Sequence, residues 1–272
     1  MTSAEGDDRV LPLTRAVAWF ITPFLLVAFA VLWPVPTDTD AVFAWQITPT
    51  LTAMILGAAY LGGAYFFVRV GRAAHWHAIK GGFVPVTTFA TLLGIATLIH
   101  WDKFHHRQLA FWLWAGLYFT TPFLVAFVYL RNRRHDAPAA DGGPRLPATT
   151  ARLIGGVGTL ALATGLLLFA APDTAIRYWP WHLTPLTARV MGAVFCLGLA
   201  GVGAFVDRRW TSARIPLQVA LVMLVLILVA GVRAHGELAS RNVLTWAVVA
   251  GFGVLFVAVA VLYLRMERRS RA

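Results

Sequence analysis

The sequence predicts an all-α integral membrane protein of eight transmembrane helices, arranged as two parallel four-helix repeats. Hydrophobic residues make up 59% of the 272 positions and charged residues only 13%, whereas about a quarter of a soluble domain is charged. Apolar runs near 20 residues, the length that crosses about 30 Å of hydrocarbon, recur along the chain. The pattern Trp-x-x-Thr-Pro also opens a long apolar run twice, at Trp45 and at Trp181.

The apolar runs predict eight membrane spans. We place them at residues 11–33, 48–70, 82–100, 109–130, 153–171, 184–206, 215–232 and 243–264. Little sequence lies between them. We therefore expect no soluble domain.

Pairs of residues at a constant spacing predict a tandem duplication. Trp112 and Trp246 are 134 positions apart, and so are Tyr129 and Tyr263. Each half holds an even number of spans, so the repeats share one orientation, as in parallel-repeat transporters. The predicted parts are a polar N-terminal tail (1–10), a first repeat (11–130), a flexible cytoplasmic linker (131–150), a second repeat (151–264) and a basic C-terminal tail (265–272).

The positions of the basic residues predict the orientation of the chain. The net charge is +11, and seventeen of the 23 basic residues fall on one side of the predicted spans. By the positive-inside rule both termini are cytoplasmic. Arginine outnumbers lysine 21 to 2, which hints at a GC-rich genome and favours a bacterial-type plasma membrane. This segregation explains the charge without a nucleic-acid partner, and the partner expected first is the lipid bilayer.

The repeated Thr-Pro pair predicts the start of a helix. At Thr48-Pro49 and Thr184-Pro185 the hydroxyl suits an N-cap, and proline suits the first helical position. Arg189 lies one turn inside the second of these helices, where a guanidinium must extend to the interface or find a partner, such as Asp173. Its counterpart in the first repeat is Met54.

Two polar stretches in the first half of the chain, the N-terminal tail and one loop, are expected to be solvated. The first ten residues should fray. His75 and His77 are two positions apart, a spacing that puts both side chains on one face only in a strand, so we expect a solvated loop there and not a metal pair.

The candidate site lies on the predicted outer face. Imidazoles and carboxylates there could bind zinc or copper, relay protons, contact a substrate, or simply face water at the membrane interface. If the repeats pack around a pseudo-twofold axis, these groups could converge over its outer mouth. The candidate ligand-binding residues are His100, Asp102, His105, His182, Arg189, His235 and Glu237.

The sequence lacks the motifs of several kinds of site. No recognised metal-ligand motif is present, and Cys196 is the only cysteine, so thiol-based metal sites and intrachain disulfides are excluded. The glycines at 155–158 follow no strand and lie in an apolar span, which excludes a dinucleotide fingerprint. We expect no cofactor and no metal site. No ionisable residue lies near the middle of a predicted span, which argues against a pump.

The function that these patterns favour is small-molecule binding or transport, with a polar site on the outer face between the repeats. A catalytic role is not favoured. One alternative is a membrane enzyme that acts on a lipid or quinone at the outer interface, with a histidine as base and Arg189 as anion clamp. Another is a non-catalytic subunit of a membrane complex. The candidate partners are accordingly a small-molecule ligand, a second copy of the chain, or a membrane partner subunit.

Overall fold

The computed structural model describes residues 7–137 and 143–271. Residues 1–6 of the predicted N-terminal tail and 138–142 of the predicted linker lie outside the described residues, and so does residue 272. The fraying and the flexibility expected for those segments therefore concern residues that are not described.

Eight helices in the described part of the chain are long and apolar enough to cross a membrane, so the chain is a multi-pass membrane protein, as predicted. The long helices are α1 (Pro12–Leu32), α3 (Thr50–Arg72), α4 (Phe83–Ile99), α5 (Leu109–Asn132), α6 (Ala148–Ala170), α10 (Trp210–Arg233) and α11 (Val243–Arg271), with the sixth span divided into α8 (Pro185–Phe195), η5 (Cys196–Gly198), α9 (Leu199–Val202) and η6 (Gly203–Phe205). Short elements complete the described chain: η1 (Pro36–Asp38), α2 (Thr39–Val42), η2 (Lys80–Gly82), η3 (Trp101–Lys103), η4 (Arg133–His135), α7 (Pro172–Ile176) and η7 (His235–Glu237).

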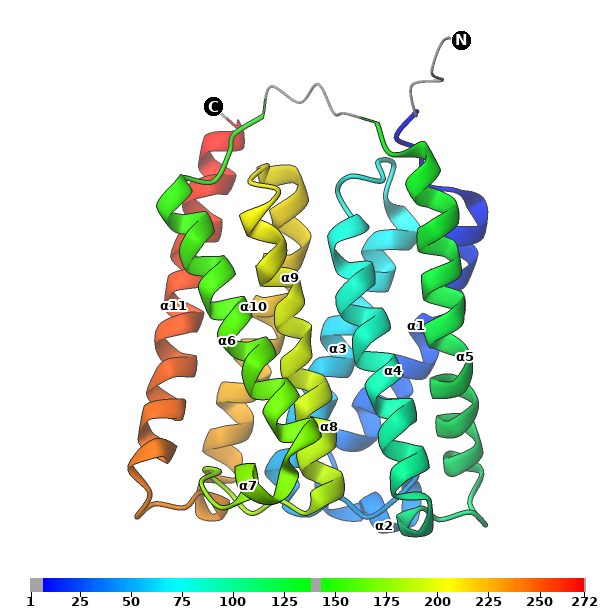
Figure 1. Ribbon diagram of the computed structural model, residues 1–272, viewed down its shortest axis with the longest axis vertical. Coiled ribbons are helices and arrows are strands. Elements are labelled where there is room, and N and C mark those ends of the chain that lie inside the picture. The colour runs from blue at the N-terminus through cyan, green and yellow to red at the C-terminus, as the bar shows by residue number, and fades with distance from the viewer. Residues whose placement is uncertain (1–6, 138–142, 272) are drawn as a thin grey trace.

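The bundle has two distinct ends (Figure 1). The described N-terminal segment, the chain that leads into α6 and the last turn of α11 lie at one end, called here the terminal end. The short helices α2 and α7 lie at the other, called here the opposite end. α11 continues to Arg271, so residues 265–271 of the predicted basic tail are helical.

The long helices pack in corresponding pairs. Within the first half α1 packs along α3 and α4 along α5, and within the second half α6 packs along α8 and α10 along α11. The halves meet where α3 packs on α10 and where α4 packs on α8. α3 is the most buried span, and its Met54, Leu56 and Tyr60 are at most 1% exposed.

Glycines bring α6 and the sixth span into close contact. A Cβ on Gly165 would stand 2.6 Å from the carbonyl oxygen of Gly192, and one on Gly158 would stand 2.6 Å from that of Gly198. Small residues permit such backbone approach in lipid, where apolar side chains gain nothing by leaving the hydrocarbon. Against α6, the sixth span tightens into two 3₁₀ turns, η5 and η6.

The helix-start prediction is confirmed at Thr184 and wrong at Thr48. Thr184 and Thr187 form a reciprocal capping box, with Pro185 at the first position of α8. The Thr48–Pro49 peptide is cis, and α3 begins only at Thr50 without a cap from its own N-cap side chain. A carboxylate from the other half of the chain occupies that place instead.

Candidate functional site

A contact between the two halves brings together two of the predicted site residues. Nη1 of Arg189, in the second turn of α8, lies 2.8 Å from Nε2 of His100, which follows the last residue of α4. The same Nη1 lies 3.4 Å from the carbonyl oxygen of Pro185. The partner that the sequence suggested for the guanidinium, Asp173, is exposed and forms no ion pair with it. The Arg189–Asp173 pairing is therefore wrong, and the imidazole takes the place of the acid.

The charge of Arg189 has no carboxylate against it among the described residues. Its Nε is buried without a hydrogen-bond partner, and its Nη1 contacts a neutral ring nitrogen and a carbonyl oxygen. Burial lowers the pKa of His100 below its ordinary value of 6.5, and the adjacent Arg189 lowers it further. The pair thus carries the positive charge of the guanidinium alone at neutral pH.

Glu237 of η7 caps α3. Its Oε1 accepts hydrogen bonds from the backbone N–H of Thr50 at 3.0 Å and from the Thr50 hydroxyl at 2.7 Å, and its Oε2 accepts from Leu51 N–H at 2.8 Å. A carboxylate at a helix N-terminus satisfies N–H groups that have no partner within the helix, and it opposes the helix dipole. Nearby, the indole N–H of Trp181 donates to the Thr52 hydroxyl at 3.0 Å. Both carboxylate oxygens of Glu237 are therefore engaged in capping a helix, whereas Nε of Arg189 has no hydrogen-bond partner.

The other predicted site residues form separate contacts at the opposite end. Asp102 pairs with Lys103 at 2.9 Å, and both side chains are exposed. His105 Nε2 lies 3.4 Å from Asp40 Oδ1. The remaining two histidines are exposed: Nδ1 of His235 faces the carbonyl of Val232 at 3.2 Å, and His182 precedes the α8 capping box. Of the seven predicted residues, only His100 and Arg189 are joined by a hydrogen bond, and the charge of Asp102 acts on His100 without contacting it.

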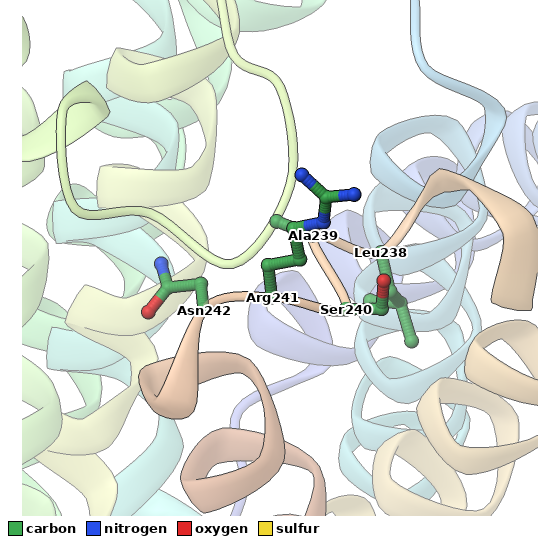
Figure 2. Close-up of a pocket in the computed structure, with 5 residues that line it drawn as sticks. All are labelled: Leu238, Ala239, Ser240, Arg241 and Asn242. Atoms are coloured by element: carbon green, nitrogen blue, oxygen red, sulfur yellow. The ribbon is translucent and has the colours of Figure 1, made fainter.

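A hollow of about 490 Å³ at this end is lined by residues 238–242. Figure 2 shows its residues on the loop that leads from η7 into α11. The backbone of this loop is held to the α7–α8 connection, since Ala239 N–H donates to the Pro180 carbonyl at 2.8 Å. All five lining residues come from one loop, so this hollow does not include the His100–Arg189 contact.

A second polar group, which the sequence did not indicate, lies at the terminal end. Asp8 Oδ2 lies against Nδ1 of His77 at 2.5 Å and 3.2 Å from Nδ1 of His75. The side chain of His77 is only 10% exposed, so the prediction of a solvated loop is wrong for that residue. His75 forms an antiparallel bridge with Arg9, so the backbone here is extended. In an extended backbone, side chains two positions apart lie on one face, which is the geometry that the sequence did not reveal for the two histidines.

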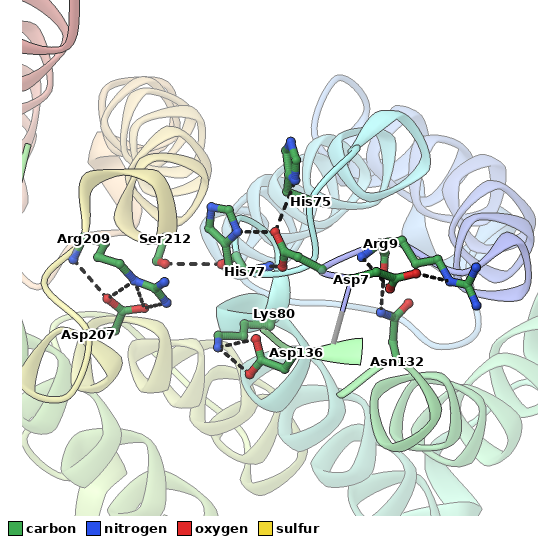
Figure 3. Close-up of polar contacts among 11 residues, drawn as sticks. Asp7, Arg9, His75, His77, Lys80, Asn132, Asp136, Asp207, Arg209 and Ser212 are labelled. Carbon is green, nitrogen blue, oxygen red and sulfur yellow. Dashed lines mark hydrogen bonds and ion pairs between the residues drawn. The ribbon is translucent and has the colours of Figure 1, made fainter. Parts of the chain in front are cut away.

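The described part of the N-terminal tail is docked on the bundle and not frayed. Buried Asn132 accepts hydrogen bonds from Leu11 N–H at 2.9 Å and from the Thr14 hydroxyl at 2.8 Å, and it donates to the Arg9 carbonyl at 2.9 Å. Figure 3 shows Asn132 at Arg9, Ser212 of the second half donating to the His77 carbonyl at 3.3 Å, and the Asp207–Arg209 ion pair beside Ser212. Polar residues at this end thus connect the first half of the chain to the second.

Comparison of this chain with protein-family models, with curated proteins and with solved structures finds no match.

Proposed function

We propose that this membrane protein binds a small anionic molecule, a carboxylate or a phosphate, between its two halves at the opposite end. The observation that carries the proposal is the guanidinium of Arg189, which faces no carboxylate among the described residues and whose Nε is buried without a partner. Arginine binds carboxylates and phosphates through two parallel hydrogen bonds. An anion at this place would both neutralise the charge and accept the free N–H groups.

The contact with His100 adds a second donor. Arginine can only donate, so the ring nitrogen that faces it must accept, and the ring proton of a neutral His100 is then on Nδ1. Nδ1–H is left free to donate to an oxygen of a bound anion. The two residues together thus suit a ligand that has at least two acceptor oxygens.

We further propose that the two halves are parallel repeats with both termini cytoplasmic, which makes the opposite end the outer face. Paired contacts support the repeat: the Trp76 and Tyr129 rings are 5.8 Å apart and those of Trp210 and Tyr263 are 5.5 Å apart. The indole N–H groups of residues 112 and 246 each donate to the carbonyl six residues earlier, both at 3.0 Å. The bias of basic residues toward the terminal end supports the orientation.

The repeat also suggests why only one half would bind the anion. The position that corresponds to Arg189 is occupied by Met54, which is 1% exposed in the core of α3. A methionine there offers no charge and no donor. We therefore propose one anion site per chain.

The first experiment measures thermal unfolding of the detergent-purified protein with inorganic phosphate, with acetate and without either anion. An anion at about 100 times its Kd stabilises the folded state by about 2.7 kcal/mol, which raises Tm by several degrees. Arg189→Met, which places the residue of the first half in the second, should abolish that rise. Arg107→Gln removes an exposed arginine at the same end and should retain it.

A lipid headgroup could supply the same phosphate chemistry. Nanodiscs of phosphatidylcholine alone and nanodiscs that contain phosphatidylglycerol separate the two sources. A Tm rise that depends on phosphatidylglycerol and on Arg189 identifies a headgroup, whereas a rise with soluble anions in phosphatidylcholine identifies a free small molecule. If neither the soluble anions nor the anionic lipid distinguishes wild type from Arg189→Met, the proposed function is wrong.

A further inference from the structure

The group formed by Asp8, His75 and His77 at the terminal end has the composition of a metal site. Each residue offers one ligand atom, and the three atoms lie within 4.8 Å of one another. The Nδ1 atoms of both histidines face the same carboxylate oxygen, Oδ2 of Asp8. We propose that these three side chains bind a divalent transition metal, with zinc as the ion that suits them best.

The donor set fits zinc. Imidazole nitrogen and carboxylate oxygen bind Zn²⁺ at about 2.0–2.2 Å, which in a tetrahedral arrangement separates ligand atoms by about 3.3–3.6 Å. Nδ1 of His75, 3.2 Å from Asp8 Oδ2, already lies near that spacing, whereas Nδ1 of His77, at 2.5 Å, would have to move outward by about 1 Å to share the ion. The side chain of His75 is 67% exposed, so its ring can adjust to the ion without disturbing the core. Three protein ligands leave one position of the ion for water or for a further ligand.

Backbone contacts hold the three ligands in place. His77 N–H donates to Oδ1 of Asp8 at 2.9 Å, which leaves Oδ2 for the metal. Trp76 N–H donates to the Asp8 carbonyl at 2.8 Å, and Asp8 N–H donates to the His135 carbonyl at 2.9 Å. Hydrogen bonds from such neighbours orient metal ligands and raise affinity.

The neighbouring charges do not oppose a cation here. Arg9, the nearest arginine in sequence, pairs with Asp7 at 3.1 Å, and Nδ1 of His135 also faces Asp7, at 3.1 Å. Lys80 pairs with Asp136 at 2.6 Å. These three positive groups are thus engaged with other carboxylates, and Asp8 is left to the two imidazoles.

A metal at this place would link three segments of the chain. Asp8 belongs to the segment before α1, the two histidines belong to the connection between α3 and α4, and the carbonyl that holds Asp8 belongs to η4 after α5. Binding would lower the amplitude of motion of all three together. Amide exchange at Asp8, Trp76 and His77, whose N–H groups make the contacts above, reports that effect.

The test measures zinc binding to full-length protein in detergent after treatment with a chelator, by elemental mass spectrometry and by calorimetry with Zn²⁺. We expect one zinc per chain and slower exchange of the three amides in its presence. His77→Ala and Asp8→Asn should each weaken binding at least tenfold. His75→Ala changes an exposed side chain that can be removed without unfolding the protein, and it should weaken binding as well.

Two control variants make the result specific. His182→Ala removes an exposed histidine at the opposite end, and Asp207→Asn removes an ion-paired carboxylate at the terminal end; both should bind zinc as wild type does. Zinc binding that is unchanged in His75→Ala and His77→Ala overturns the proposal. So does the absence of stoichiometric zinc in wild-type protein that unfolds cooperatively. The anion experiment uses Arg189 variants, so either proposal can fail without the other.

Discussion

The two halves of the chain use the same backbone contacts at the terminal end but different side chains. In the first half Trp76 N–H donates to the carbonyl of Asp8 at 2.8 Å, and in the second half Trp210 N–H donates to the carbonyl of Pro144 at 3.0 Å. An antiparallel bridge lies beside each contact, between residues 9 and 75 and between residues 145 and 209. The difference teaches that main-chain hydrogen bonds can fix the local geometry while the side chains at the same positions change their chemistry.

The side chains around these bridges illustrate the change. His75 stands where the second half has Arg209, and the carboxylate that faces it is Asp8. Arg209 instead pairs with Asp207, two residues before it, at 2.7 Å. Burial alone would raise the pKa of Asp207, but hydrogen bonds from Arg209 outweigh it and hold that pKa well below the ordinary value. In the second half, the always-charged Arg209 holds Asp207 in an ion pair. In the first half, the imidazoles beside Asp8 leave that carboxylate open to the metal proposed above.

The largest effect is expected from exchanging a buried residue between the halves. Asn132, fully buried at the end of α5, corresponds to Met266, 1% exposed near the end of α11. Asn132→Met removes three hydrogen bonds and leaves Leu11 N–H and the Thr14 hydroxyl without their acceptor. Each such buried group costs about 1–3 kcal/mol, so we expect a loss of about 3 kcal/mol in the free energy of unfolding.

Equilibrium unfolding in mixed detergent measures that loss. Met266→Leu is the control, because a swap between apolar side chains of similar volume costs less than about 1.5 kcal/mol. Equal losses in the two variants would mean that the hydrogen bonds of Asn132 do not anchor the N-terminal segment.

The span positions were predictable from the sequence because they depend on local hydrophobicity. The eight predicted spans agree with the eight apolar helices to within a few residues at most ends. The capping box of Thr184 was equally local. The contacts that define the candidate sites were not, because Asp8 and His77 are 69 residues apart and His100 and Arg189 are 89 apart. The sequence identified His100 and Arg189 singly but could not pair them.

An intermediate effect is expected from the helix caps, which also differ between the halves. Glu237 caps α3 from the other half of the chain, whereas Thr184 caps α8 from the adjacent position. Glu237→Gln places an NH₂ group against backbone N–H donors and should cost about 1–2 kcal/mol. Thr184→Ala should cost about 1 kcal/mol.

Hydrogen exchange locates the loss. In Glu237→Gln the amides of Thr50 and Leu51 should exchange faster, and in Thr184→Ala that of Thr187 should do so. Asp173→Asn changes an exposed acid at the same end and serves as the control. Unchanged exchange at Thr50 and Leu51 would show that α3 does not depend on the second half for its cap.

The smallest effect is a dependence of the free energy of unfolding on pH, which arises at His100 and not at the corresponding position of the second half. Burial, and then Arg189, lowers the pKa of His100 below 6.5 in the folded state, so the unfolded chain takes up its proton first. This contribution to stability is complete above the unfolded pKa and is lost as the pH falls toward the folded pKa. The position 134 residues later is Ala234, which does not titrate.

The free energy of unfolding between pH 7.5 and 5.5, compared in wild type and His100→Gln, isolates this term. The decrease on acidification should be smaller in the variant. An identical decrease would mean that His100 does not resist protonation in the folded protein.

The cap on α3 sets an order for the synthesis of the chain. Thr50 and Leu51 are made long before Glu237, 187 and 186 residues earlier. During that interval the first N–H groups of α3 must remain in water or headgroups, since hydrocarbon offers them no acceptor. Only after η7 has been synthesised can Glu237 cap α3 and this end of α3 pack against the bundle. The first half is therefore synthesised before α3 has its cap, and the cap forms only after the residues up to Glu237 have been added.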